Sequence, residues 1–125
     1  MARAAEVLVV TCRLTPATRN LVDARILDAL GADGFLVNVA RGAIVDEDAL
    51  IAALASGRIA GAALDVFRDE PRVPAALMMM DNVVLAPHMG TSTREIRDER
   101  SRKLLTDLRA FFAGKRSEER RVERV

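Results

Sequence analysis

The sequence is poor in several residue types, and each scarcity narrows the class of protein. It contains one cysteine, neither tryptophan nor tyrosine, and only four phenylalanines. An internal disulfide therefore cannot form within these residues, which favours a reducing, cytoplasmic compartment. Few aromatic side chains are available on which unpaired bases could stack. The formal net charge is only +1, so the total charge also gives no reason to expect a nucleic-acid partner.

Long apolar segments are lacking as well. The apolar run at residues 7–10 is too short for the core of a signal peptide, and it follows the acidic Glu6. No stretch approaches the length that spans a bilayer, so we expect no membrane partner. Hydrophobic residues make up 50% of the chain and charged residues 30%, which is typical of a globular protein. The 125 residues suit one domain or part of one.

Four short apolar segments are predicted to be strands, and they cover residues 6–11, 34–39, 59–64 and 82–86. Their apolar residues are mostly contiguous rather than alternating, as in strands that are buried on both faces of a parallel sheet. Helix signals alternate with these segments. Asp23 is predicted to cap a helix that runs through Leu30. Asp46 is predicted to cap a second helix, which has the acidic Glu47 in its first turn and stops at Gly57.

The last part of the chain predicts one long helix. Residues 92–95 form a capping box, and the helix that they open ends at Gly114. Residues 115–125 are nearly all charged and are predicted to be a solvated or frayed tail. The alternation of strands and helices through short links predicts an α/β fold, with a parallel sheet and helices on both faces.

Three polar side chains with complementary chemistry follow successive predicted strands. Arg41 follows the second strand, Glu70 comes after the third, and His88, the only histidine, follows the fourth. In open α/β sheets, ligands bind beyond the carboxyl ends of the strands. We therefore expect a guanidinium, a carboxylate and an imidazole at one edge of the sheet.

Each of these residues also has a purely structural alternative. Arg41 could bind a carboxylate through its planar fork or form an ordinary surface ion pair. Glu70 could favour the charged form of His88 and fix its tautomer, or merely cap the turn before Pro71. His88 is suited to protonating a carbonyl oxygen, although a lone histidine is more often structural. Asp65 could accept hydrogen bonds from a bound amide or form a turn.

Three ordered motifs resemble those of the D-isomer-specific 2-hydroxyacid dehydrogenases. They are an arginine motif at residues 37–47, a glutamate motif at 61–71 and a histidine motif at 82–95. The resemblance covers about residues 5–114, and among family members it is nearest to the glyoxylate/hydroxypyruvate reductase-like enzymes. It implies that residues 1–114 are the second half of a Rossmann-like, dinucleotide-binding domain, with a return helix at about 93–113.

The resemblance also implies an activity and a role for each motif residue. The activity is hydride transfer between NAD or NADP and a small 2-keto or 2-hydroxy acid, such as glyoxylate or hydroxypyruvate. Arg41 would orient the substrate, His88 would transfer the proton, and Glu70 would pair with His88. Asp65 would accept a hydrogen bond from the nicotinamide carboxamide. No metal is implied, and the residues at the cofactor would be Thr11, Cys12, Val39, Ala40, Asp65, His88, Met89 and Gly90.

The sequence departs from the family pattern in three respects. Arg13 stands where the family usually has proline, and Ala17 where it often has glutamate. The glycine-rich segment that seats the cofactor's pyrophosphate is not among these residues. The first predicted strand would then leave an open apolar edge, and the last helix an unpartnered apolar stripe. We therefore expect a homo-oligomer or association with the half that is not present here.

Three possibilities remain open at this point. The first is an enzyme, or the catalytic half of one, because the arginine, the glutamate and the histidine are all present. The second is a truncated, catalytically inactive remnant that persists as a folded or interaction module, because half of the cofactor site is not in the sequence. The third is an unrelated α/β domain, which the order of the motifs disfavours.

Overall fold

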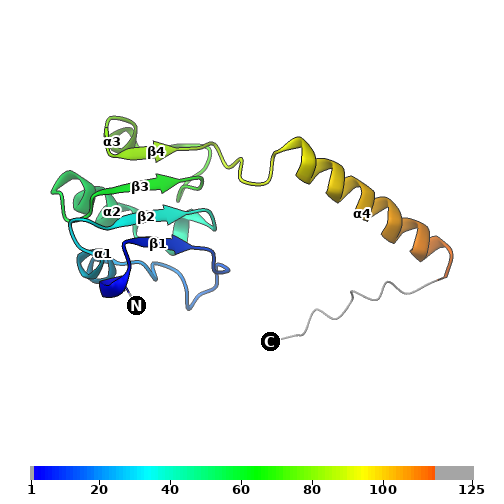
Figure 1. Cartoon of the computed structure of the whole chain (residues 1–125), viewed down its shortest axis with the longest axis horizontal. Coiled ribbons are helices and arrows are strands. Elements are labelled where there is room, and N and C mark those ends of the chain that lie inside the picture. Colours follow the sequence, from blue (N-terminus) through cyan, green and yellow to red (C-terminus); the bar gives the residue numbers. More distant parts are fainter. Residues whose placement is uncertain (1, 115–125) are drawn as a thin grey trace. The chain divides into compact units, whose positions relative to one another are not determined.

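The structure is a computed structural model that describes residues 2–114, and it divides into two units at residue 90. The first unit contains the sheet and its helices, and the second contains one long helix (Figure 1). Each unit is described by itself. The charged tail predicted at residues 115–125 lies outside the described residues.

Four parallel strands form one sheet in the order in which they occur along the chain. They are β1 (Val7–Val10), β2 (Phe35–Asn38), β3 (Gly61–Leu64) and β4 (Val83–Leu85). Each lies within a predicted segment and is shorter than predicted. The α/β class and the parallel sheet are therefore confirmed.

The register places the carboxyl ends of the four strands beside one another. Val10 is paired with Asn38, Asn38 with Leu64, and Leu64 with Leu85. The loops that follow the strands consequently start from one edge of the sheet. This is the edge at which the candidate site residues were expected.

Two helices connect the first three strands, and both begin at the predicted caps. Asp23 precedes α1 (Ala24–Leu30), and its side chain accepts a hydrogen bond of 3.1 Å from the amide of Ile26. Asp46 precedes α2 (Glu47–Ala55), and its side chain accepts one of 3.1 Å from the amide of Ala49. Each carboxylate thus satisfies an amide that has no partner within the helix.

The hydrophobic core lies between these helices and one face of the sheet. Leu27 of α1, Leu50 of α2 and Leu36 of β2 are each no more than 1% exposed. The opposite face carries Val9 and Val84, which are 51% and 69% exposed. In Figure 1, α1 and α2 both lie behind the sheet.

Among residues 2–90, helices α1 and α2 therefore cover one face, whereas the sequence predicted helices on both faces. The strand order explains the difference. Each crossover adds the next strand on the same side of the previous one, and right-handed crossovers that step in one direction place their helices on one face.

Three short elements were not predicted. They are the 3-10 helices η1 (Ala2–Ala4) and η2 (Gly42–Ile44) and the single helical turn α3 (Ala75–Met78). Each has only three or four residues, which is too few to show a hydrophobic period of 3.6 residues. Leu77 of α3 is 1% exposed and adds to the core near β4.

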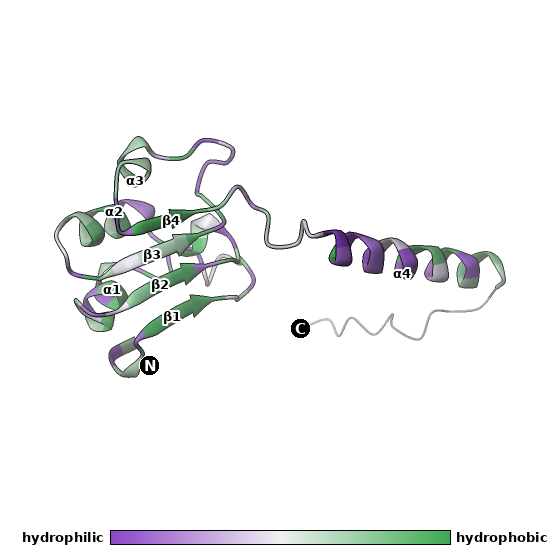
Figure 2. Cartoon of the chain, turned by 45° about the horizontal axis from the view of Figure 1, so that its top comes forward, coloured by the Kyte–Doolittle hydropathy of each residue, from purple (hydrophilic) through white to green (hydrophobic). Residues whose placement is uncertain are grey.

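The second unit contains α4 (Arg94–Phe112), which the capping box predicted. The cap is Thr93, whose hydroxyl accepts a hydrogen bond of 3.3 Å from the amide of Ile96. Hydrophilic residues dominate the start of the helix, and hydrophobic residues become more frequent toward its end (Figure 2). The large apolar side chains near its end are exposed, and they are Leu104, Leu105, Leu108, Phe111 and Phe112. No helix among the described residues is long and apolar enough to cross a membrane.

Candidate active site

The loop after β2 is shaped by a buried asparagine. Asn38 is 1% exposed, and its side-chain oxygen accepts a hydrogen bond of 3.1 Å from the amide of Ala40. Its side-chain nitrogen donates one of 3.1 Å to the carbonyl of Arg41. These bonds fold the chain back immediately after the strand and place Arg41 at the carboxyl edge of the sheet.

The guanidinium of Arg41 is exposed and has no acidic partner at close range. Its only hydrogen bond among the described residues is donated to the carbonyl of Ala40, at 2.6 Å. No ion pair forms between Arg41 and another residue of the described range, so the structural alternative of a surface ion pair is not seen. The fork of the guanidinium remains available for a ligand anion.

The loops after β2 and β3 pack closely against each other next to Arg41. A Cβ on Gly42 would overlap the carbonyl of Phe67, so only glycine allows this approach of the two backbones. Glu47 in the first turn of α2 is 7% exposed, and its carboxylate accepts a hydrogen bond of 3.0 Å from the amide of Arg68. The same carboxylate lies 3.5 Å from the Nε of Arg68. These contacts position the loop that carries Glu70.

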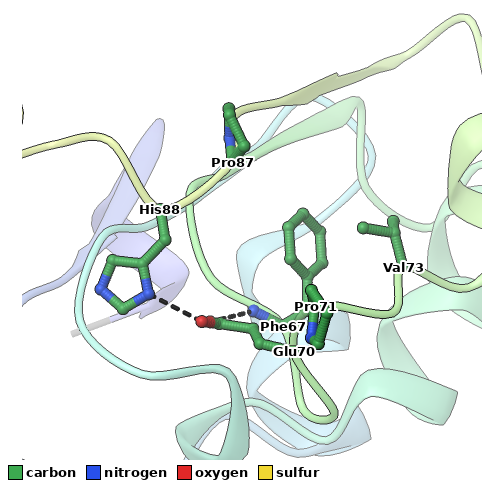
Figure 3. Close-up of a pocket in the computed structure, with 6 residues that line it drawn as sticks. All are labelled: Phe67, Glu70, Pro71, Val73, Pro87 and His88. Carbon is green, nitrogen blue, oxygen red and sulfur yellow. Dashed lines mark hydrogen bonds and ion pairs between the residues drawn. The ribbon is translucent and has the colours of Figure 1, made fainter.

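Glu70 uses its two carboxylate oxygens for two different contacts. Oε1 accepts a hydrogen bond of 3.0 Å from the amide of Phe67, and Oε2 lies 2.7 Å from Nδ1 of His88 (Figure 3). The turn-capping contact and the pairing with His88 were alternatives in the sequence, and both occur. The hydrogen bond from His88 is the main reason why the pKa of Glu70 lies below its usual range. The amide of Phe67 and, more weakly, the charges of His88 and Arg41 lower the pKa of Glu70 further.

His88 has an uncommon backbone conformation. Its φ is 50°, in the left-handed region that residues other than glycine seldom adopt. The two amides that follow it are both held by Asp65, which is 8% exposed. Oδ1 of Asp65 accepts a hydrogen bond of 2.7 Å from Met89, and Oδ2 accepts one of 2.9 Å from Gly90.

A pocket of about 150 Å³ lies beside the pair formed by Glu70 and His88. The other four lining residues are apolar, and they are Phe67, Pro71, Val73 and Pro87. Figure 3 shows that the second ring nitrogen of His88, Nε2, points away from Glu70. Among the described residues, the only hydrogen bond of the ring is that of Nδ1, so Nε2 is available to a ligand.

The residues expected at the cofactor lie along the same edge of the sheet. Thr11 and Cys12 follow β1 and are exposed, and Val39 after β2 is 49% exposed. Beyond β4, Met89 is 53% exposed. The structure thus brings Glu70 into contact with His88, and Asp65 into contact with Met89 and Gly90. The remaining members are Arg41, whose charge influences Glu70, and Thr11, Cys12, Val39 and Ala40 at the neighbouring strand ends.

Two residues of this region were missed by the sequence analysis. Asn38 was treated only as part of a strand, although a polar residue at the end of an apolar segment and just before a loop is a signal for a side-chain turn. Glu47 was explained only by its place in the first turn of a helix. No local pattern could reveal its contact with Arg68, which is 21 residues further along the chain.

A parallel sheet with an arginine, a glutamate–histidine pair and a buried aspartate at its carboxyl edge defines an open α/β domain whose candidate ligand site lies beyond the ends of its strands. Comparison with known proteins identifies its kind. Residues 1–90 match the NAD-binding domain of the D-isomer specific 2-hydroxyacid dehydrogenases. The chain therefore belongs to this family, as its motifs predicted.

Individual relatives agree with this assignment. The chain is 50% identical to glyoxylate/hydroxypyruvate reductase A HPR2 of Arabidopsis thaliana over 115 residues. These aligned residues cover 92% of this chain and 37% of the relative. The chain is 45% identical to hydroxyphenylpyruvate reductase of Plectranthus scutellarioides, with the same two coverages of 92% and 37%.

Solved structures give the same result. The NADPH-dependent glyoxylate/hydroxypyruvate reductase of Sinorhizobium meliloti, in complex with NADP and malonate, superimposes with a TM-score of 0.82 at 45% identity. The match covers 89% of this chain and 35% of that one. The chain thus spans little more than a third of the length of these relatives.

Proposed function

We propose that this chain carries the catalytic residues of an oxidoreductase that transfers a hydride between a nicotinamide cofactor and a small 2-hydroxy or 2-keto acid. The contact of 2.7 Å between Nδ1 of His88 and Glu70 is the observation that carries the proposal. Relatives named glyoxylate/hydroxypyruvate reductase support glyoxylate or hydroxypyruvate as the substrate. In this proposal, residues 1–114 are the second half of a dinucleotide-binding domain, including the long helix at about 93–113.

The glutamate–histidine pair would supply the proton in the reductive direction. Because the pKa of Glu70 is lowered, its carboxylate stays charged at neutral pH and accepts a hydrogen bond from Nδ1–H of His88. In the imidazolium form of His88, the ring carries a proton on Nε2 as well as on Nδ1. His88 would donate this proton to the keto oxygen and would take it back in the oxidative direction.

Arg41 would hold the other end of the substrate. Its guanidinium is exposed, permanently charged and without an acidic partner among the described residues. A bidentate contact with the substrate carboxylate would fix the orientation of a small 2-keto acid. The keto carbon would then face the cofactor and the keto oxygen would face His88.

The residues at the carboxyl edge fit a nicotinamide group, either of NAD or of NADP. When it is bound, the nicotinamide supplies or accepts the hydride. Asp65 uses one lone pair of each oxygen for a backbone amide, so a second lone pair remains for a carboxamide N–H. The exposed backbone at Val39 and Ala40, the side chains of Thr11 and Cys12, and the segment 88–90 would line the ring and its ribose.

We also propose that the chain associates through the uncovered face of its sheet. Val7, Val9, Phe35 and Val84 are each between 48% and 69% exposed on this face, and β1 has a free edge. The partner that fits is the complementary half of a dinucleotide-binding domain, since that half would supply a further parallel strand and helices for this face. The alternative partner is a second copy of the chain, and sedimentation of the chain alone would reveal such a dimer.

Activity with and without the complementary part of a relative tests the proposal. Oxidation of NADH and NADPH would be followed with glyoxylate and with hydroxypyruvate, first with the chain alone and then with the remaining part of the Arabidopsis relative added. We expect turnover in the second mixture, and His88→Ala should abolish it, whereas Asp28→Asn on α1 should not. If neither mixture is active and neither cofactor binds, the alternative of a catalytically inactive module is favoured.

A further inference from the structure

We infer that Asp65 is a positioning residue for His88: its carboxylate holds the two backbone amides that follow His88 and so fixes the conformation in which the imidazole reaches Glu70. The inference rests on the proposed function, because it concerns the proposed proton donor. It adds a second role to Asp65 beside that of a hydrogen-bond acceptor for the cofactor.

The contacts of Asp65 form a clamp around one short segment. Its two oxygens accept separate hydrogen bonds, 2.7 Å from the amide of Met89 and 2.9 Å from that of Gly90. Hydrogen bonds to a charged acceptor are stronger than those between neutral groups. Asp65 is only 8% exposed, so water competes weakly for these contacts. The side chain of Asp65 thus ties the end of β3 to the loop after β4.

The segment that Asp65 holds begins at His88, whose backbone conformation requires support. His88 has a φ of 50°, and such a conformation persists in a residue other than glycine only where its surroundings enforce it. The amides held by Asp65 belong to the next two residues. Their fixed direction constrains the peptide that leaves His88, and with it the direction of the bond from Cα to Cβ.

Gly90 fits the same explanation. A Cβ on Gly90 would lie 3.0 Å from Oδ2 of Asp65, which is tighter than nine in ten real contacts of a Cβ atom, so the carboxylate would have to shift. Its φ is not among the positive values of the chain, so the backbone conformation alone does not require glycine here. The absence of a side chain at Gly90 instead leaves room for the carboxylate of Asp65.

The first experiment uses nuclear magnetic resonance on the chain without ligand. His88 is the only histidine, so its ring nitrogens give a single, unambiguous set of signals. Asp65→Asn puts an amide, which has one acceptor oxygen, against two backbone donors. The amide and Hα protons of residue 88 are close together at positive φ, so we expect the nuclear Overhauser effect between them to become weaker. We also expect the loss of the ring signal of an Nδ1 proton that is hydrogen-bonded to a carboxylate. The pKa of Glu70 should rise toward its usual range, since the hydrogen bond from His88 is the main cause of its lowering.

Two further variants make the outcome decisive. Asp28→Asn removes an exposed carboxylate that pairs with Arg58 and contacts none of the site residues, so the signals of His88 should be unchanged. Gly90→Ala keeps the carboxylate of Asp65, but its new Cβ would push against that carboxylate and weaken the two hydrogen bonds to the backbone. This variant should therefore reproduce the changes at His88. Unchanged signals in a folded Asp65→Asn chain overturn the inference, and if that variant does not fold, Gly90→Ala decides in the same way.

Kinetics separate the two roles of Asp65 once an active assembly is in hand. A displaced proton donor should lower kcat by about 100-fold with little change in KM for the cofactor. A residue that only binds the carboxamide should instead raise KM for the cofactor. Asp65→Asn is therefore expected to lower kcat, and a change confined to KM for the cofactor would contradict the positioning role. The resonance measurements need no activity. The positioning role can therefore fail while the proposed function holds, and the proposed function can fail while the positioning role holds.

Discussion

The carboxylate of Glu47 and the amide of Arg68 are joined by a hydrogen bond of 3.0 Å. This contact links the first turn of α2 to the loop between β3 and Pro71, and the same loop presents Glu70 to His88. A residue that begins a helix therefore supports the candidate acid–base pair from outside the site. Its neighbour Asp48 binds only the guanidinium of Arg68, at the surface.

The two acidic residues should differ in their effect on stability. Glu47→Ala leaves the amide of Arg68 without its buried acceptor, and we expect a loss of about 1–3 kcal/mol in the free energy of unfolding. Asp48→Ala is the matched control, because its side chain is 74% exposed and its ion pair is screened by solvent, so its effect should be much smaller. Urea denaturation of both variants measures the difference. Equal losses in the two variants would show that the buried contact is unimportant.

Acid should weaken the fold partly through Glu70. Its pKa is lower in the folded chain than the usual value of about 4.3 in the unfolded one, so its ionisation stabilises the fold above that pH. The contribution is lost as the pH falls through the lowered pKa. We therefore expect the difference in unfolding free energy between the natural chain and Glu70→Gln to be constant near neutral pH and to shrink in acid. Denaturation curves at a series of pH values test this, and a difference that grows on acidification would contradict the lowered pKa.

The two faces of the sheet should respond differently to substitution. Leu36 is fully buried under α1 and α2, so Leu36→Ala should cost about 2–5 kcal/mol. Phe35, the preceding residue of β2, is 48% exposed on the other face, so Phe35→Ser should cost much less. If the uncovered face binds a partner, Phe35→Ser should reduce association in a sedimentation experiment. Unaltered association would locate the interface elsewhere.

The general plan of the fold could be predicted from the sequence because its signals are local. Contiguous apolar segments indicated the strands, and the caps at Asp23 and Asp46 marked the helix starts within one residue. The order of the strands then placed Arg41, Glu70 and His88 at one edge. What could not be predicted depends on contacts between distant segments. The close packing of Gly42 against Phe67 and the hold of Asp65 on the loop after β4 are two examples.

The coverage of the sheet could not be predicted for a related reason. A strand of contiguous apolar residues indicates that both faces of the sheet are buried. It does not indicate whether the helices that cover each face come from this part of the chain or from elsewhere. Within residues 2–90 the crossovers supply helices to only one face, and Val9 and Val84 on the other stay exposed. The apolar pattern of the strands therefore does not by itself show what covers the face that carries Val9 and Val84.

Replacement of the exposed arginine gives the most direct test of substrate binding. Arg41→Lys keeps the positive charge but removes the planar fork, so a bidentate contact with a carboxylate is lost. In an active assembly we expect kcat/KM for the keto acid to fall by about 10-fold to 100-fold, which corresponds to roughly 1.5–3 kcal/mol for a hydrogen bond to a charged group. Arg72→Lys is the matched control, since Arg72 pairs only with Asp69 at the surface and should leave kcat/KM unchanged. An Arg41→Lys enzyme with the kinetics of the natural one would mean that another group binds the substrate carboxylate, and the assignment of Arg41 would then be wrong.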